Sequence, residues 1–420
     1  MARSRSVLYV WQADYPWDVR TEKVCRALTD SGSVVHLAAR NRGWGPRAET
    51  LAEAVVHRLP EWQWAGQRLD GALQFPAFFN PRWNSLLSDI VRTERPDVIM
   101  VRDLPLCPTA IRVARRFGVP VVLDMAENYP AMIDNVWATG RQKPWDVVVR
   151  NPRWVAAVES YCIRRVDHIL VVVEESAARL VGRGVPRERI DVVSNTPPAS
   201  RAVRPRSTGA RRLDARVELV YLGIQEVVRG LLELVEAVRI LRDQAVPVRA
   251  TIVGGGRDAD LFRARARELR LTADDIVFTG HLPGHEAALE AIARADVGVI
   301  ATHKTAESES TIPNKLFDYM AAGLAVLTSD VTPCARIVRE TGAGEVFRAG
   351  DAGDLAAAAR RVVEDAGRRE AAGEAGRRAI VTRYNWETDS AVLRRVVDRV
   401  AIEPRTHTAT ALAWRDNPTA

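Results

Sequence analysis

The sequence has few cysteines and lacks the segments that secretion or membrane insertion requires. The cysteines are scattered along the 420 residues without a Cys-x-x-Cys pair: Cys25, Cys107, Cys162 and Cys334. This spacing argues against a disulfide scaffold and a zinc ribbon, and it favours a reducing compartment. Near the N-terminus, Gln12 and Asp14 interrupt the first apolar run, which is then too short for a signal peptide or a membrane span. We therefore expect a cytoplasmic location.

The sequence also lacks the patterns of nucleic-acid-binding modules. It contains no helix-turn-helix, RNP or zinc-finger pattern, although 60 Lys and Arg side chains exceed 53 Asp and Glu and give a net charge of +7. That excess suits an anionic partner without naming it. Many of the arginines lie at the spacing of solvated helix faces, so we expect no nucleic acid among the partners.

Motifs for metals and dinucleotide cofactors are weak. The stretch VGGG (253–256) lacks the Gly-x-Gly-x-x-Gly spacing of dinucleotide-binding sites. Asp258 and Asp260 spell Asp-x-Asp, but they open a predicted helix, where capping and the helix dipole favour acids. A proline and a glycine separate His281 from His285 and prevent a helical pair of zinc ligands. We expect neither a metal nor a cofactor.

The sequence does contain a regular alternation of short, β-branched apolar runs with helical patterns. Alternation of this kind predicts α/β domains with doubly wound parallel sheets, whose ligands bind at the carboxyl ends of the strands. The predicted strands span residues 6–11, 33–39, 97–101, 120–124, 168–173 and 191–194 in the first half, and 217–223, 249–256, 275–280, 296–300 and 324–329 in the second.

An arginine-rich stretch divides the two halves. Residues 201–216 combine Pro, Gly and Ser with six arginines and a single acid, a composition typical of an exposed linker. We therefore expect one domain over residues 1–200 and a second over residues 217–383. Residues 403–420 show no periodicity, and we expect a disordered tail there.

The stretch IPNKLFDYMAAG (312–323) predicts a helix that opens on Pro313 and ends at Gly323. Its apolar side chains fall at the spacing of a buried stripe. The side chains that this stripe leaves for solvent or a ligand are Asn314, Lys315, Asp318 and Tyr319.

Two cations lie at predicted helix starts that follow strands. Arg229 with Gly230 follows the strand 217–223, and Asn314 with Lys315 follows the strand 296–300. Free backbone N–H groups and the helix dipole favour anions there, so the pattern predicts a clamp for a diphosphate. The alternative for Lys315 is a surface pair with Asp318, worth a few tenths of a kcal/mol. The residues alone leave both open.

The order of motifs in the second half resembles the nucleotide-binding domain of the retaining GT-B glycosyltransferases of family 4, the group 1 glycosyltransferases. The resemblance spans most of residues 217–383 and extends more weakly over the first half, where WQADYPWDVR and VVLDMAENYPAM look like acceptor-side elements. The motifs that carry it are YLGIQEVVRG, IVGGGRDADLF, IVFTGHLP, ARADVGVI and PNKLFDYMAAGLAVLTSD.

This resemblance implies a GT-B fold with two facing Rossmann-like domains, a cleft between them and a terminal helix over 384–402 that crosses back to the first domain. It implies metal-independent transfer of a sugar, with retention, from a nucleotide-diphosphate sugar to an acceptor hydroxyl. The acceptor would be a glycan, a glycolipid or a small molecule, in cell-envelope or secondary-metabolite synthesis. The alternative is a catalytically silent nucleotide-sugar-binding or scaffold protein.

The resemblance assigns roles residue by residue. Arg229 would hold the donor diphosphate, and Asp318, as the second family acid, would bind the ribose. The first family acid is replaced by Ser310, for which Glu307 and Glu309 are nearby substitutes. Many members carry a further arginine where Ile224 stands, which makes Lys315 our candidate for the missing charge. The expected donor-binding residues are Gly223, Gly230, Gly254, His281, Pro313, Asn314 and Asp318.

The acceptor side is less specific. Many family members carry a histidine after the strand 120–124, where this chain offers Glu127 or Asp124. Glu127 is therefore a catalytic candidate beside Arg229 and Lys315, with a loop carboxylate as the equal alternative. Residues of lower rank follow other strands: Arg20, Arg102, Asp103 and Asn195, the last of which could equally be a turn residue.

Tryptophan is concentrated in the first half. Nine of eleven tryptophans precede residue 155, including Trp62, Trp64 and Trp83. Core packing explains buried tryptophans. The other interpretation is an apolar, cation-flanked surface that docks on the inner face of a membrane or on a lipid-linked acceptor.

Overall fold

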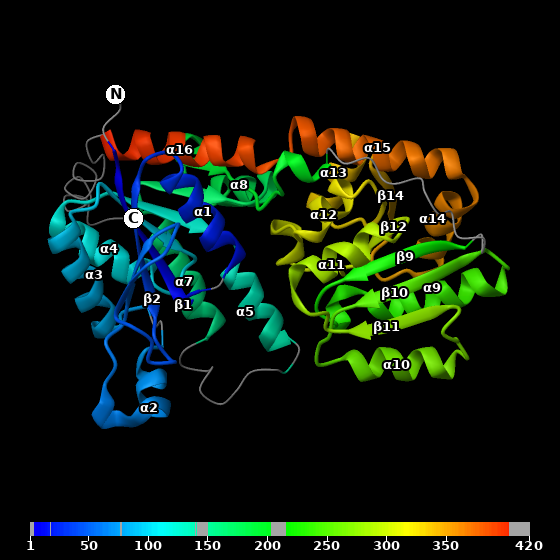
Figure 1. Cartoon of the computed structure of the whole chain (residues 1–420), viewed down its shortest axis with the longest axis horizontal. Helices are drawn as coiled ribbons and strands as arrows, with labels where there is room; N and C mark the ends of the chain where they lie inside the picture. Colours follow the sequence, from blue (N-terminus) through cyan, green and yellow to red (C-terminus); the bar gives the residue numbers. More distant parts are fainter. Residues whose placement is uncertain are drawn as a thin grey trace, which may run out of the picture. The chain divides into compact units, whose positions relative to one another are not determined.

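The computed structural model describes residues 4–16, 18–75, 78–138, 140, 150–202 and 216–402. Most of the predicted linker and the whole predicted tail lie outside the described residues. The described chain forms two compact units. Unit 1 comprises the residues up to Ser194 together with those from Ser390, and unit 2 spans Asn195–Asp389. Figure 1 shows the elements of each unit.

Unit 1 is built on an eight-stranded sheet in the order β3-β4-β2-β1-β5-β6-β7-β8. All neighbouring strands are parallel except β3, which runs antiparallel to β4. The predicted strands are all present, and β3 and β4 are added to them. The strands are β1 (Ser6–Asp14), β2 (Val34–Arg40), β3 (Ala48–Thr50), β4 (Val55–Arg58), β5 (Val98–Arg102), β6 (Val121–Met125), β7 (His168–Val171) and β8 (Ile190–Val192).

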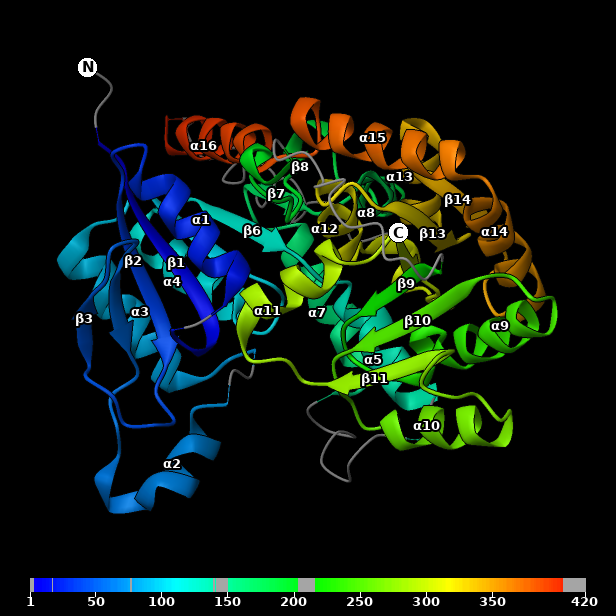
Figure 2. The same ribbon diagram turned by 45° about the vertical axis from the view of Figure 1, so that its right-hand side comes forward.

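Helices cover both faces of this sheet, as expected for strands that are apolar on both sides (Figures 1 and 2). Leu8 and Val10 of β1 pack in one cluster with α3 and α4, whereas Tyr9 points to the opposite face. The helices are α1 (Val19–Thr29), α2 (Gly66–Leu73), α3 (Pro81–Glu94), α4 (Cys107–Phe117), α5 (Tyr129–Ala138), α7 (Pro152–Ile163), α8 (Glu174–Val181) and α16 (Trp386–Ile402), which joins unit 1 from Ser390.

Unit 2 is built on a six-stranded parallel sheet in the order β11-β10-β9-β12-β13-β14. Its strands are β9 (Val217–Leu222), β10 (Val248–Val253), β11 (Ile276–Gly280), β12 (Val297–Ile300), β13 (Ala325–Ser329) and β14 (Gly344–Phe347). Its helices are α9 (Leu231–Asp243), α10 (Ala259–Glu268), α11 (Gly284–Ala293), α12 (Lys315–Ala321), α13 (Thr332–Thr341), α14 (Ala352–Glu364) and α15 (Ala366–Thr382). The prediction of doubly wound α/β architecture is confirmed.

Strand order reverses once in each unit. The chain passes from β1 to β2 on one side and later to β5 on the other, and from β9 to β10 and later to β12. At such a switch point, the two loops leaving the central strands diverge and open a crevice for a ligand at the carboxyl edge of the sheet. The residues that follow β9 and β12 are therefore the first place to look for a site in unit 2.

The helix α12 differs from its prediction in two respects. It begins at Lys315 and is seven residues long, so Pro313 and Asn314 precede it. Tyr319 is fully buried, and the prediction of a solvent- or ligand-facing Tyr319 is wrong. Its ring fills the space beside Gly298, where a Cβ would lie 2.3 Å from the ring, and its hydroxyl accepts a hydrogen bond from the Leu222 N–H at 2.8 Å. Gly298 of β12 has no side chain and therefore leaves room for the Tyr319 ring.

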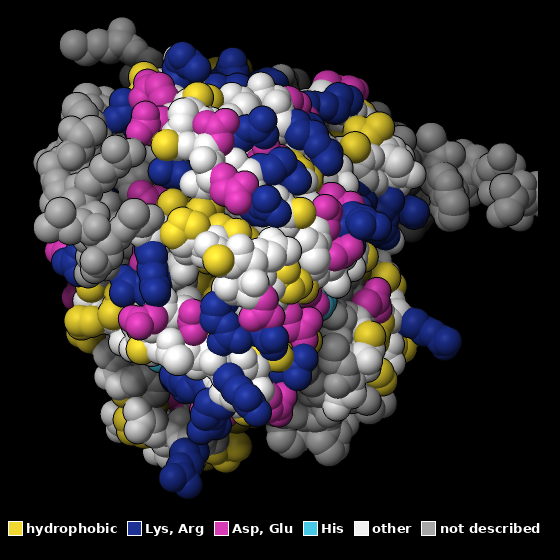
Figure 3. Space-filling model, turned by 90° about the vertical axis from the view of Figure 1, so that its right-hand side faces the viewer, with side chains coloured by type: hydrophobic (Ala, Val, Ile, Leu, Met, Phe, Trp, Pro, Cys, Tyr) yellow, Lys and Arg dark blue, Asp and Glu magenta, His cyan; other side chains and the backbone are white. Residues whose placement is uncertain are grey.

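The face of unit 2 in Figure 3 carries basic and acidic side chains interspersed, as expected of solvated helix faces. Pairs such as Arg239 with Asp243 on α9 and Arg360 with Glu364 on α14 have the i, i+4 spacing. None of the described helices combines the length and the apolar content needed to span a membrane.

Candidate active site

In unit 2, the loops after β9 and β12 lie against each other. The His303 N–H donates a hydrogen bond to the Val228 carbonyl at 2.9 Å. Gly230, with a φ of 72°, lies so close to the end of β12 that a Cβ there would be 1.8 Å from the Ala301 oxygen. Only glycine fits this turn, which ends a 3₁₀ helix over Val227–Arg229 and starts α9. The turn places Arg229 beside the neighbouring loop.

Lys315 reaches the same place from α12. Its ammonium lies 3.9 Å from the centroid of the Tyr221 ring, at the carboxyl end of β9. Gly223 lies directly beneath it, since a Cβ at that position would be 2.9 Å from the Lys315 nitrogen. Cation–π contact with the tyrosine face holds the ammonium without neutralising it. The two cations predicted from separate motifs are thus brought to neighbouring strand ends.

The electrostatics of this pair are unusual. Burial, and then the positive charge of Arg229, lower the pKa of Lys315 to about 7. Within the part of the chain that the structure describes, neither Arg229 nor Lys315 has a carboxylate partner. Two cations close together without a counterion are costly for the fold, and such perturbed groups concentrate at binding sites for the opposite charge. The arrangement suits a multiply charged anion.

A glycine loop adjoins the cations. Gly254, with a φ of 117°, approaches the Gly223 carbonyl so closely that a Cβ would lie 2.2 Å from its oxygen. Gln225 is buried and braces the loop, because its side-chain nitrogen donates to the Gly254 carbonyl at 2.6 Å. His281 lies next to Gly255, where a Cβ would come within 2.5 Å of its Nε2. The structure therefore gathers Gly223, Gly254 and His281 in one region, as their assignment to one donor site requires.

The two positions of the family acids lie on α12 and just before it: Asp318 is part of the helix, and Ser310 ends a short 3₁₀ helix over Ser308–Ser310. The Asp318 carboxylate is 3.5 Å from the Arg201 guanidinium, so a cation from outside α12 faces this acid. Ser310 is buried and donates its hydroxyl to the Ala306 carbonyl at 2.8 Å. Of the proposed substitutes, Glu309 accepts a hydrogen bond from the Thr332 N–H at 3.2 Å. At and near the position of the first family acid, Ser310 therefore bonds to the backbone of its own loop and Glu309 bonds to the first residue of α13.

Asp258 and Asp260 have structural roles in the described chain. The Asp258 carboxylate accepts a hydrogen bond from the Val227 N–H at 3.0 Å. Asp260 is exposed and forms a pair with Arg263 one turn along α10. His281 precedes α11, which begins at Gly284. Asp258 stands at the N-cap of α10 but makes no side-chain cap hydrogen bond, and Asp260 lies in the first turn, where the helix dipole favours an acid.

The acceptor-side candidates of unit 1 form a buried network. The Arg20 side chain is 3% exposed, and its Nη2 lies 2.5 Å from Asp124, which is fully buried. The Tyr9 hydroxyl donates to the same carboxylate at 2.7 Å. Although burial acts to raise it, the Arg20 guanidinium holds the pKa of Asp124 below its usual value. Arg20 and Asp124 therefore brace the sheet against α1.

Arg102 and Asp103 link three segments at the strand ends. Arg102 binds Asp18, the N-cap of α1, and stacks 4.3 Å from the Trp11 ring. The Asp103 carboxylate accepts hydrogen bonds from the Ala126 and Glu127 N–H groups at 2.9 and 3.1 Å. Burial raises the pKa of Asp103 to about 6. Asp103 thus fixes the backbone of Glu127, whose side chain is exposed. Asn195 is half-buried at the first position of unit 2.

Comparison with known families settles the class of this fold. The model described as "Glycosyl transferases group 1" matches residues 216–365, and the model described as "Glycosyl transferase 4-like domain" matches residues 18–196. The chain belongs to the group 1 glycosyltransferases, of GT-B fold. The family and the fold that the resemblance implied are confirmed.

Individual relatives agree with this glycosyltransferase assignment. A glycogen synthase from Mycobacterium tuberculosis is 28% identical over 306 residues, which are 71% of this chain and 67% of that protein. Among solved structures, sucrose-phosphate synthase from Thermosynechococcus elongatus aligns with a TM-score of 0.73 at 15% identity, over 94% of this chain and 99% of that one. Anabaena HepE in complex with UDP-glucose aligns with a TM-score of 0.65 at 13% identity, over 94% and 100% of the two chains.

Two residues of this glycosyltransferase escaped the sequence prediction. Tyr221 supports the Lys315 ammonium, and Gln225 braces the glycine loop. An aromatic residue in a buried strand has the pattern of a core residue, so no signal marked Tyr221. Gln225 carried a weak signal, because a polar residue in the loop after a strand is a candidate for a strand-end site.

Proposed function

We propose that the enzyme transfers a sugar, with retention, from a nucleotide-diphosphate sugar to an acceptor hydroxyl. The observation that carries the proposal is the convergence of Arg229 and Lys315, without carboxylate partners in the described chain, at the switch point of the unit 2 sheet. A diphosphate supplies the negative charge that these two cations lack. In this proposal, Gly223 and Gly254 let the donor approach the backbone, and His281 borders the nucleoside.

The two cations would act mainly on the transition state. Breaking the glycosidic bond develops negative charge on the departing diphosphate, so a fixed cation near it gains more interaction as the bond breaks. Lys315 rests on an uncharged ring and Arg229 is set by a rigid glycine turn, so neither must leave a counterion first. The departing phosphate oxygen takes the proton of the acceptor hydroxyl. Glu127, exposed after β6, is the protein carboxylate that could assist.

The experiment that tests this function is transfer from a panel of UDP-, GDP- and dTDP-sugars to a glucan or lipid acceptor, in excess chelator. Uridine donors lead the panel because the similar HepE chain is described with UDP-glucose, and glucans are included because the relative in M. tuberculosis is a glycogen synthase. We expect transfer to persist without divalent metal and the product to keep the donor's anomeric configuration. Inactivation by chelator that Mg²⁺ or Mn²⁺ reverses would contradict the role given to Arg229 and Lys315.

A catalytically silent nucleotide-sugar-binding protein is the second candidate. The observation that favours it is Ser310, a buried serine whose hydroxyl is engaged by the Ala306 carbonyl where the family has an acid. Such a protein would bind nucleotide diphosphates as tightly as an enzyme but would neither transfer nor hydrolyse the sugar of any donor in the panel.

The tryptophans around α2 support a membrane-bound acceptor. Trp83 is fully buried and belongs to the core, whereas Trp64 is 77% exposed and stacks with Trp62 at 5.6 Å. Exposed Leu69 and the exposed arginine at position 68 lie on α2 beside them. Aromatic and basic side chains together favour anionic lipid surfaces. We therefore propose that the enzyme, in keeping with the cytoplasmic location expected from the sequence, contacts the inner face of the membrane through this segment.

Vesicle binding tests this placement. Replacing Trp62 and Trp64 with Ser should weaken sedimentation with vesicles that contain anionic lipid, while Trp154→Ser, an exposed tryptophan on α7, serves as the matched control. Equal sedimentation of the double variant and the wild type would refute the docking role.

A further inference from the structure

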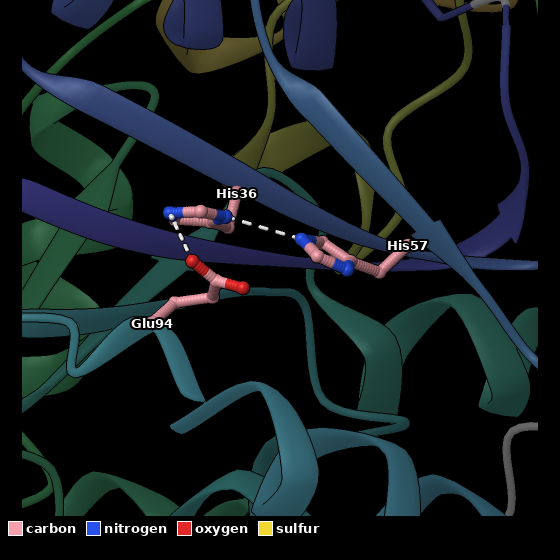
Figure 4. Close-up of side chains that lie close together, drawn as sticks. All are labelled: His36, His57 and Glu94. Atoms are coloured by element: carbon pink, nitrogen blue, oxygen red, sulfur yellow. Dashed lines mark hydrogen bonds and ion pairs between the residues drawn. The ribbon is translucent and has the colours of Figure 1, made fainter. Parts of the chain in front are cut away.

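Unit 1 contains a cluster of two histidines and a glutamate that the transfer reaction does not use. His36 lies in β2, His57 in β4 and Glu94 at the last position of α3. In the parallel register, His36 pairs with Val55, so His57, two residues further on, points to the same face of the sheet. Figure 4 shows His36 between the other two side chains.

The distances within the cluster fit ligands of one ion. His36 Nδ1 and His57 Nε2 are 3.1 Å apart. Two nitrogens bound tetrahedrally to zinc at about 2.0–2.1 Å would be separated by roughly 3.3 Å. The Glu94 carboxylate is 3.7 Å from the other ring nitrogen of His36, Nε2, whereas one ion takes a single nitrogen from each histidine. With one ligand atom from each of the three residues, the atoms all lie within 4.8 Å of one another. Binding one ion would therefore require the His36 ring and the Glu94 side chain, which lies at a helix end, to turn so that one His36 nitrogen faces both partners.

The chemistry of the cluster fits as well. His36 is 6% exposed and His57 is half-buried, and the nitrogen of a neutral imidazole is a ligand that Zn²⁺ readily takes. Glu94, at the edge of the cluster, is more exposed and leaves a route for an ion from solvent. Two imidazoles and one carboxylate form a borderline donor set that suits Zn²⁺ better than Mg²⁺ or Ca²⁺.

We propose that His36, His57 and Glu94 form a structural zinc site that ties β2 and β4 to the end of α3, with water completing the coordination. The three residues come from different elements, so an ion would link strands β2 and β4 of the unit 1 sheet to the end of helix α3. The ion has no part in sugar transfer. Without an ion, the two histidines share one proton in a hydrogen bond, which is the interpretation that the experiment must separate from a metal site.

The test titrates ZnCl₂ into the full-length protein after dialysis against a chelator, with MgCl₂ as a parallel titration. We expect one zinc per chain, a rise in Tm of a few degrees that MgCl₂ does not produce, and unchanged initial transfer rates with and without zinc. His36→Gln and His57→Gln should each weaken zinc binding by at least about 100-fold, and Glu94→Gln by about 10-fold. His303→Gln is the matched control, because His303 also contacts a glutamate, Glu233, at 2.9 Å.

Equal zinc affinity of the wild type and the His57→Gln variant would overturn the proposal, as would binding without a rise in Tm. A spectroscopic measurement on the wild type covers the case in which a variant does not fold. The zinc X-ray absorption spectrum of the 1:1 complex should show two imidazoles at about 2.0 Å. A spectrum without histidine scattering would overturn the assignment independently of any variant.

Discussion

The two units treat the charges at their strand ends differently. In unit 1, Arg20 is bound to buried Asp124 and Arg102 is bound to Asp18. In unit 2, Arg229 and Lys315 lie together without a carboxylate partner among the described residues. A fold tolerates such a local conflict mainly where a ligand resolves it. The difference teaches that strand-end charge alone does not identify a ligand site, because in unit 1 such charge is neutralised within the protein; uncompensated charge, as in unit 2, is the better candidate for a ligand site.

The largest expected effect comes from removing one charge of the neutralised pair in unit 1. Asp124→Ala removes the only carboxylate that binds Arg20 in the described chain and leaves a buried guanidinium without its counterion. We expect unit 1 to lose about 3–5 kcal/mol of unfolding free energy, measured by urea denaturation. The matched control, Asp89→Ala, removes an exposed partner of Arg92 and should cost less than about 1 kcal/mol. Equal losses would show that the buried pair is not a brace.

The next largest effect comes from removing either of the two cations in unit 2 that have no carboxylate partner among the described residues. Arg229→Ala and Lys315→Ala should each lower kcat by about 10²- to 10³-fold, because each removes a cation from the developing charge of the diphosphate. Neither variant should lower Tm, since each relieves repulsion between the two cations. Lys304→Ala is the control, because Lys304 is exposed and already bound to Asp330 at 2.8 Å. A large fall in Tm with unchanged kcat would make the two cations structural.

The pH dependence of nucleoside diphosphate binding tests whether Lys315 must be charged in the bound state. Lys315 has a pKa of about 7 in the free protein, so the fraction that carries the charge falls as pH rises above 7. The phosphates are already ionised there, with a second pKa of about 6. Affinity for a nucleoside diphosphate should therefore weaken by up to about tenfold per pH unit above 7, in isothermal titration calorimetry. The profile of Lys315→Met should be flat over the same range. A flat profile in the wild type would exclude a charged Lys315 from the bound state.

The smallest effect concerns Asp318. If its carboxylate binds the ribose hydroxyls, Asp318→Asn should raise the donor KM several-fold while the fold survives, since the side chain is 14% exposed and the amide keeps its size and one acceptor oxygen. Because Arg201 also faces Asp318, Arg201→Ala separates the two roles. A donor KM that changes equally in Arg201→Ala and Asp318→Asn would assign Asp318 to the ion pair instead of the ribose.

Much of the fold could be predicted from local patterns. Runs rich in β-branched residues, such as that of β10, and apolar stripes, such as that of α9, mark their elements because the burial of one or both faces restricts which residues can stand there. The short strands β3, β4 and β14 escaped because AET, VVHR and GEVF are too short and too polar to show a period. Helix α2 escaped for a related reason, since it buries little besides Asp70.

The candidate site could be predicted only in part. Arg229 and Lys315 carried a signal because each follows a strand within a recognisable motif. The burial of Arg20 carried no local signal, because its partner Asp124 lies 104 residues away in the sequence. The burial of Tyr319 depends in the same way on Gly298, a position in another element. Local periodicity assigns faces to an element, but it cannot show which distant residue fills or neutralises that face.

The most direct test of the central claim compares nucleoside diphosphates with the corresponding monophosphates. If Arg229 and Lys315 hold a diphosphate, the wild type should bind the preferred diphosphate much more tightly than its monophosphate in isothermal titration calorimetry at pH 6.5, and Arg229→Gln should lose most of that preference while keeping its affinity for the monophosphate. The Lys304→Ala control should keep the full preference. An Arg229→Gln variant that still distinguishes diphosphate from monophosphate as the wild type does would contradict the claim.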